Sequence, residues 1–170
     1  MKNVFFFLTV FLAFACGEQP KAVEEKAAFS IEQIKDGVIY EVNVRQYSKE
    51  GTFDGFTQDI PKLKELGVKV IWLMPIHPIS KEKRKGELGS YYSISDYKGV
   101  NPEFGDKESF DRLVQAAHKN DMLVIIDWVA NHTGWDHPWI TNNPDFYSKN
   151  EAGEIIDPVN PETGESWGWT

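Results

Sequence analysis

Residues 122–132 read MLVIIDWVANH, and this stretch decides the fold. A nearly continuous apolar run over 122–128 favours a strand buried on both faces, as in a parallel sheet. Two earlier runs have the same β-rich character, VIYEVNV at 38–44 and VKVIWLM at 68–74. The sequence therefore predicts three strands of one sheet.

Two helix patterns separate the three runs. In the first, apolar residues share one helical face and end before Gly67; they are Phe56, Ile60, Leu63 and Leu66. In the second, Asp106 is a plausible N-cap, and apolar residues recur at helical spacing over 110–117. The order is β-α-β-α-β, for which the crossover rule predicts parallel strands and right-handed connections.

The loops after the three strands are long and uneven. They cover 45–54 and 75–105, and after the third strand no helix pattern is visible up to residue 170. Loops of this length are uncommon in a compact domain unless they are functional, and all three follow strand C-termini, where α/β folds bind ligands. A complete eight-stranded barrel needs about 250 residues. We therefore expect either a truncated barrel, which we favour, or a smaller open α/β domain.

The composition restricts the class of ligand. The chain has 170 residues, a formal net charge of -8 and 14% aromatic residues. An acidic surface repels phosphates, which argues against nucleic acid. A neutral ligand such as a sugar fits better. Five of the six tryptophans lie between Trp128 and Trp169, which suggests a local aromatic surface.

The N-terminus has the pattern of a signal peptide over 1–15, with a short basic start and an apolar run. Cys16, the only cysteine, follows directly, so an intrachain disulfide is excluded. It resembles the acylated cysteine of bacterial lipoproteins, although Leu12 stands one place early. A lipid anchor at Cys16 on the cell envelope and simple secretion both remain open. Residues 16–33 read as a polar tether before the folded part begins at about residue 34.

The candidate site lies at the end of the third strand. Asp127 is expected at the mouth of the sheet, with Asn131 and His132 in the loop just beyond it. A carboxylate, an amide and an imidazole on one rim can orient sugar hydroxyls and hold calcium. Taken alone, the same residues could equally be a structural cap of the strand.

Several motifs in order resemble the α-amylase family, glycoside hydrolase family 13. VIIDWVANHT at 124–133 is similar to its first signature region, and VIYE at 38–41 to its first strand. Two more segments resemble the part of the family that precedes its second helix. They are GSYYSISDY at 89–97, which is similar to a loop motif, and VNPEFG at 100–105, which is similar to the segment directly before the helix. The resemblance implies a partial TIM (β/α)8 barrel, with its first three units over 34–128 and the start of an inserted small domain over 129–170.

The resemblance also implies roles for single residues. Tyr92 would stack on the sugar at the cleavage site, His132 would bind that sugar's hydroxyls, and Asp127 would organise the site. Asn131 would be a calcium ligand. The family cleaves α-glucosidic bonds in starch-like glucans with retention, using an Asp nucleophile and a Glu acid/base. Both would follow Thr170, so no catalytic residue is assigned here, and we expect the 170-residue chain to be inactive.

Other readings stay open. A relative that transfers or isomerises glycosyl units, such as a trehalose synthase or transglucosidase, would share these motifs, and so would a non-catalytic glucan-binding surface protein. His77 and His137 could line the cleft or pack. Trp135 and Trp139 could pack the third loop or form an outer sugar platform, and the basic stretch 81–85 reads as a solvated loop tip.

Overall fold

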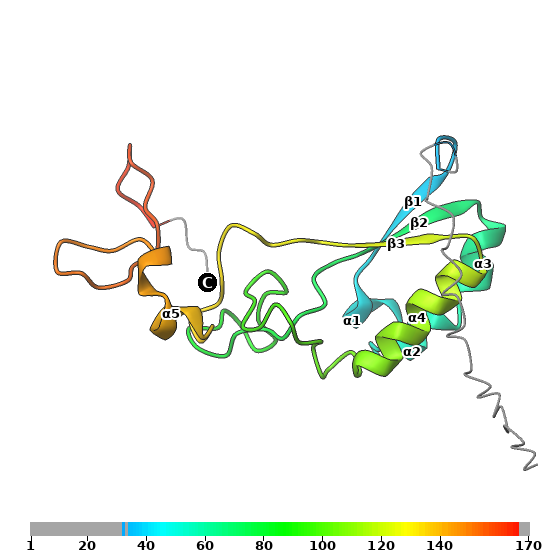
Figure 1. The fold of residues 1–170 in the computed structure, drawn as a ribbon, viewed down its shortest axis with the longest axis horizontal. Coiled ribbons are helices and arrows are strands. Elements are labelled where there is room, and N and C mark those ends of the chain that lie inside the picture. The colour runs from blue at the N-terminus through cyan, green and yellow to red at the C-terminus, as the bar shows by residue number, and fades with distance from the viewer. Residues whose placement is uncertain (1–31, 33, 167–170) are drawn as a thin grey trace, which may run out of the picture.

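The computed structural model describes residue 32 and residues 34–166. Its strands are β1 (Val38–Val42), β2 (Val68–Leu73) and β3 (Leu123–Ile126), which form one parallel sheet in the order β1-β2-β3. The predicted partial α/β fold with three parallel strands is thus confirmed. Figure 1 shows helices packed beside this sheet, with the long loops leaving its far end.

The two faces of the sheet differ. Tyr40 on β1, Ile71 on β2 and Val124 on β3 are paired neighbours that pack into the core with the helices. One residue further along each strand, Glu41, Trp72 and Ile125 are also paired, and side-chain alternation turns them to the opposite face. Ile125 is 44% exposed, so this second face is only partly covered in the described chain.

The strands are shorter than predicted. The first strand, expected over 38–44, ends at Val42, and Val44 already begins the short helix α1 (Val44–Tyr47). The third, expected over 122–128, is paired only over Leu123–Ile126, although the Asp127 N–H still donates to the Leu73 carbonyl at 2.9 Å. Only β2 is buried on both faces, because β1 and β3 are the edges of the described sheet.

The first predicted helix is in fact two helices, α2 (Phe53–Thr57) and α3 (Ile60–Glu65). Thr52 caps α2 by accepting from the Gly55 N–H. A proline lies in the first turn of α3, where its missing N–H has no cost, so a new helix starts there. Phe56, Ile60 and Leu63 are buried as predicted, whereas Leu66 is 65% exposed.

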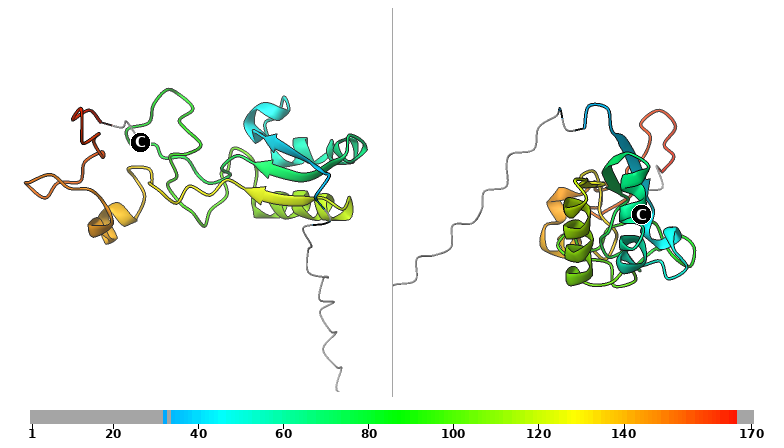
Figure 2. Two further views of the ribbon diagram at one scale, coloured as in Figure 1. Left: turned by 90° about the horizontal axis from the view of Figure 1, so that it is seen from above. Right: turned by 90° about the vertical axis from the view of Figure 1, so that its right-hand side faces the viewer.

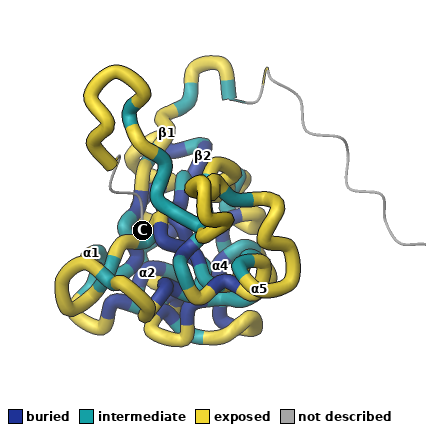
Figure 3. Tube along the Cα trace, turned by 90° about the vertical axis from the view of Figure 1, so that its left-hand side faces the viewer, coloured by how far each residue is buried: buried dark blue, intermediate teal, exposed yellow. Residues whose placement is uncertain are grey.

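The second predicted helix is α4 (Lys107–Lys119). Asp106 is its N-cap, as predicted, and forms a reciprocal capping box with Ser109. Leu113 and Ala117 are fully buried against the sheet side of the core. Helix α4 packs against α2, and the two helices lie next to the buried strand β2 in the part of the chain where Figure 3 shows buried backbone in dark blue.

After β3 the chain runs away from the sheet and is mostly exposed (Figures 2 and 3). We expected no helix there, but α5 (Trp139–Asn142) and the 3-10 turn η2 (Pro144–Phe146) form in this segment. No helix in the described part of the chain is long and apolar enough to span a bilayer. The predicted signal peptide, Cys16 and nearly all of the tether lie outside the described residues.

Candidate functional site

Asp127 lies at the C-terminal end of β3, on the face of the sheet away from the helices. One of its carboxylate oxygens accepts from the Trp72 indole N–H at 3.3 Å. The other accepts from the Tyr92 hydroxyl at 2.7 Å. Asp127 is therefore held between strand β2 and loop 75–105, which follows β2. Its carboxylate oxygens have further lone pairs that can accept from a ligand.

Tyr92 comes from the middle of loop 75–105 and is 38% exposed. Its hydrogen bond to Asp127, with burial adding to it, raises the pKa of the Tyr92 phenol to about 12. The phenol therefore stays protonated near neutral pH and donates to the carboxylate. This bond fixes the ring at the edge of the sheet, where one side of it can meet a ligand.

His132 joins the same group. Its Nδ1 lies 3.2 Å from the Asn131 amide nitrogen, which can only donate, so Nδ1 is the acceptor and the ring is neutral. Burial lowers the pKa of His132, and a hydrogen bond to the Tyr92 backbone opposes that shift. The structure thus brings Tyr92, Asp127 and His132 together, with Asn131 beside them.

Several contacts tie the two long loops to each other. The Asp136 carboxylate accepts from the Lys81 N–H at 2.8 Å, and Lys83 lies 3.1 Å above the Trp135 ring. Within loop 75–105 itself, Arg84 donates to the Ser80 carbonyl at 2.8 Å. The stretch 81–85 is exposed except at Arg84, which is half-buried, so its prediction as a solvated loop tip fits the structure, and Lys81 and Lys83 also contact the third loop.

His77 and His137, the two histidines that could line the cleft or pack, contact neighbouring groups by packing and hydrogen bonds. His77 Nδ1 lies 2.9 Å from the Gly99 carbonyl, and its ring packs near Tyr97. His137 is 6% exposed and accepts from the Trp139 backbone N–H at 3.1 Å. The Trp139 ring packs on His137 and Phe146, but it is also 42% exposed, so the structure leaves a sugar platform at this tryptophan as a prediction.

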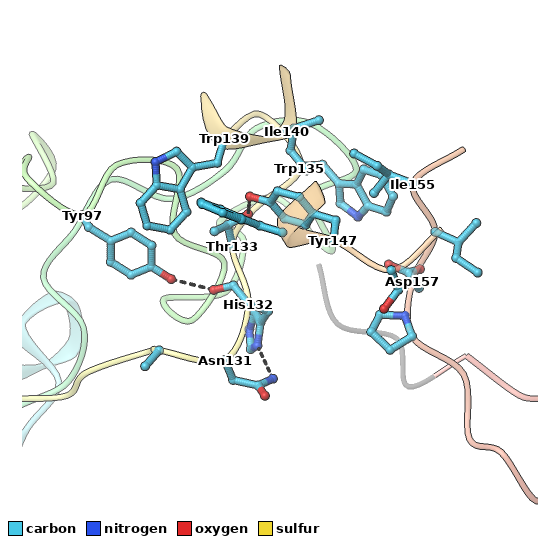
Figure 4. Close-up of a pocket in the computed structure, with 15 residues that line it drawn as sticks. Tyr97, Asn131, His132, Thr133, Trp135, Trp139, Ile140, Tyr147, Ile155 and Asp157 are labelled. Atoms are coloured by element: carbon cyan, nitrogen blue, oxygen red, sulfur yellow. Dashed lines mark hydrogen bonds between the residues drawn. The ribbon is translucent and has the colours of Figure 1, made fainter. Parts of the chain in front are cut away.

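A cavity of about 250 Å³ lies in the segment after β3 (Figure 4). It shares Asn131 and His132 with the site, whereas Tyr92 and Asp127 do not line it. The site itself is therefore an open edge next to this cavity. The other main walls are aromatic, namely Tyr97, Trp135, Trp139, Phe146 and Tyr147.

Among the described residues, few carboxylates lie near Asn131, the predicted calcium ligand. Asn131 and Asp157 line the same cavity, but calcium takes six to eight oxygen ligands. No group of three or more His, Cys, Asp or Glu side chains among the described residues could hold a metal ion. Calcium at Asn131 stays a prediction, and no step below depends on it.

Two residues at the site were not predicted. Trp72 was seen only as part of an apolar run, although its bond to Asp127 follows from the strand register. Tyr97 was noted only as part of a motif, but its hydroxyl contacts two carbonyls of the third loop. The sequence offers no signal for this role, because Tyr97 lies in a loop rich in polar residues, where a tyrosine that only packs would look the same.

Comparison with known proteins gives consistent results. The family described as "Alpha amylase, catalytic domain" matches residues 23–158. The chain is 36% identical over 158 residues to an alpha-1,4-glucan:maltose-1-phosphate maltosyltransferase of Cereibacter sphaeroides, covering 82% of this chain and 25% of that protein. It is 44% identical over 93 residues to alpha-amylase SusG of Bacteroides thetaiotaomicron, covering 54% and 12%.

Among solved structures, an alpha-amylase from Lactobacillus plantarum matches with a TM-score of 0.67 at 41% identity. The match covers 74% of this chain and 32% of that one. The described fold thus corresponds to about a third of that structure. Against the curated relatives, the chain spans about a quarter of their length or less.

Proposed function

The chain belongs to the α-amylase catalytic-domain family, glycoside hydrolase family 13, and from this premise we propose that it forms the first part of a secreted enzyme that cleaves α-glucosidic bonds. In this proposal, further strands close the sheet into the barrel. The face that carries Glu41, Trp72 and Asp127 would then point to the barrel interior. The substrate is a starch-like glucan or a maltooligosaccharide.

One observation carries the proposal. Tyr92, Asp127 and His132 come from two different loops and meet at the C-terminal edge of the sheet, linked by the 2.7 Å bond between Tyr92 and Asp127. An aromatic ring face suits the C–H face of a pyranose. A carboxylate acceptor and a neutral imidazole beside it suit sugar hydroxyls, which both donate and accept.

The chemistry of bond cleavage is assigned to residues outside this chain. Retaining enzymes of this kind use two carboxyl groups about 5–5.5 Å apart, one as nucleophile and one as acid/base. Asp127 is bonded to Tyr92 and Trp72 and serves neither role in our proposal. Its part, and that of His132, is to hold the sugar at the cleavage point in a reactive orientation.

The test uses the full-length protein with maltoheptaose, and the products are separated by chromatography. Shorter maltooligosaccharides and free glucose support hydrolysis. Replacing His132 with Gln is expected to lower kcat/KM by about 100-fold, because a sugar contact that tightens in the transition state is lost. No cleavage of any α-glucan, with intact folding, would contradict an enzymatic role and favour a glucan-binding protein.

A second candidate is a glycosyl transferase of the same family. The maltosyltransferase relative, which matches over 82% of this chain, favours it. Products longer than the substrate, or maltosyl transfer from maltose 1-phosphate to a glucan, would identify this activity. The described site is compatible with both, since each begins by holding a sugar at the same edge.

Secretion and a lipid anchor at Cys16 complete the proposal. Cells that express the chain with labelled palmitate should incorporate label into the wild type and not into Cys16→Ser. Unlabelled wild-type protein in the culture medium would support simple secretion. Label in the Cys16→Ser variant would contradict the assignment of the anchor.

A further inference from the structure

We propose that Tyr97 is the positioning residue of His132, an inference that rests on the proposed function because His132 is placed there at the sugar. Tyr97 lies in loop 75–105, five residues after Tyr92. It thus links the loop that carries the aromatic ring to the loop that carries the imidazole.

The hydroxyl of Tyr97 lies 2.6 Å from the carbonyl of Val129 and 2.6 Å from the carbonyl of His132. It has one proton, so the two carbonyls share it. Burial raises the pKa of Tyr97, which keeps that proton in place at neutral pH. The hydroxyl therefore closes a short bend that contains Asn131 and sets where His132 leaves the backbone (Figure 4).

The ring of Tyr97 is held on several sides. It packs near the rings of Trp128, His137 and Trp139, with centroids 5.4–5.8 Å apart. Because Trp139 and His137 belong to the third loop as well, the ring cannot move without moving that loop. The ring contacts therefore orient the Tyr97 hydroxyl, and the hydroxyl in turn holds the backbone of Val129 and His132.

From His132 the effect passes to the sugar-binding group. Its imidazole bonds to the Asn131 amide on one side and to the Tyr92 backbone on the other. Tyr92 in turn holds Asp127. A shift of the His132 backbone therefore displaces the imidazole from the Asn131 amide and from the Tyr92 backbone, and the alignment of Tyr92, Asp127 and His132 is lost with it.

The test is a double-mutant cycle in the full-length protein with maltoheptaose as substrate. Tyr97→Phe keeps the ring and removes only the hydroxyl, and we expect kcat/KM to fall about 10-fold. In a His132→Gln background the same change should cost less than about 2-fold, because Tyr97 acts through His132. Equal losses in both backgrounds would overturn the proposal. Tyr47→Phe, which removes the hydroxyl that donates to Asp59, is the matched control.

Hydrogen exchange provides a readout that needs no activity. Tyr97→Phe should speed exchange over 129–134 and leave α4 unchanged, and Tyr47→Phe should leave 129–134 unchanged. In the wild type, a slowly exchanging Tyr97 hydroxyl proton should be visible by NMR. If the wild type does not act on glucans, the proposed function fails. The exchange rates over 129–134 and the NMR signal of the Tyr97 hydroxyl proton still test whether Tyr97 anchors the His132 backbone. Unchanged exchange over 129–134, or a rapidly exchanging hydroxyl proton, would overturn this anchoring.

Discussion

The Tyr92 hydroxyl donates to the Asp127 carboxylate over 2.7 Å, so the ring is oriented before any ligand arrives. Tyr92→Phe should lower kcat/KM of the full-length enzyme about 10-fold, because a hydrogen bond to a charged group is lost while the ring face remains. Tyr92→Ala should lower it by about 100-fold or more, since the ring face is lost too. Steady-state kinetics on maltoheptaose measure both, with Tyr47→Phe as control. Equal effects of the two substitutions would argue against a stacking role.

The buried imidazoles predict a pH effect on stability. Burial lowers the pKa of both His132 and His137 below the usual value of about 6.5. Between the folded and unfolded values the unfolded chain binds more protons, so the free energy of unfolding falls as pH drops below about 6.5. Urea unfolding at pH 7.5, 6.5 and 5.5 measures this loss. The His132→Gln, His137→Gln double variant should show a smaller loss, and an unchanged pH dependence would contradict the assignment.

At the scale of single residues, the sequence predicted those site residues that lie together in one short motif. Asp127, Asn131 and His132 are close in sequence, so one strand end places them together. Trp72 and Tyr97 could not be assigned, because their partners lie 55 and at least 32 residues away. Such bonds depend on strand register and on the path of a long loop, and neither can be derived from spacing in a single sequence.

Helix α4 shows how an element positions the site from a distance. Asp106 and Ser109 fix its start, and Leu113 is fully buried between it and the sheet. Leu113→Ala should lower the free energy of unfolding by about 2–5 kcal/mol, since a cavity remains in the core. Urea titration followed by tryptophan fluorescence measures it. The exposed Gln115→Ala on the same helix should change it by less than about 0.5 kcal/mol, and a similar loss there would contradict the core role of Leu113.

Elements with a strong apolar period were predicted well, whereas their ends were not. Helix α4 was predicted because capping and period agree at Asp106 and Leu113. The break between α2 and α3 was missed, because the apolar spacing of Phe56, Ile60 and Leu63 continues across it. Helix α5 has one turn and no buried residue, so it leaves no periodic signal.

At the scale of the whole molecule, the helices and the site lie at different places. The core is built around β2 with α2 and α4, whereas the site lies where the long loops leave the sheet. Because of this division, the loops can vary in sequence while the sheet keeps the points where they start fixed. The proposed sugar-binding group of Tyr92, Asp127 and His132 therefore forms from the long loops at the edge of the sheet and not in the core.

We therefore expect the purified segment 17–170 to release no reducing sugar from starch. The reason is chemical, since the proposed function gives Asp127 and His132 the role of orienting a sugar and assigns neither of them as nucleophile or as proton donor to the leaving group. The full-length protein is the positive control in the same colorimetric assay. Clear hydrolysis by the segment 17–170 would refute this and would require a catalytic carboxylate among its own residues.

The partly covered face of the sheet predicts association of the same chain. Ile39 on β1 is 58% exposed and Ile125 on β3 is 44% exposed, and both strands are edges of the described sheet. Exposed apolar edge strands pair with other chains, and a charged residue on such an edge prevents it. The variant Ile39→Lys, Ile125→Lys should thus weaken self-association about 10-fold or more in analytical ultracentrifugation, a loss of about 1.4 kcal/mol. Leu66→Lys, at an apolar residue that is 65% exposed next to α3, should leave it unchanged. Weak interfaces already form at a protein concentration of about 100 μM. A wild-type chain that stays monomeric there would contradict association through the face that carries Ile39 and Ile125.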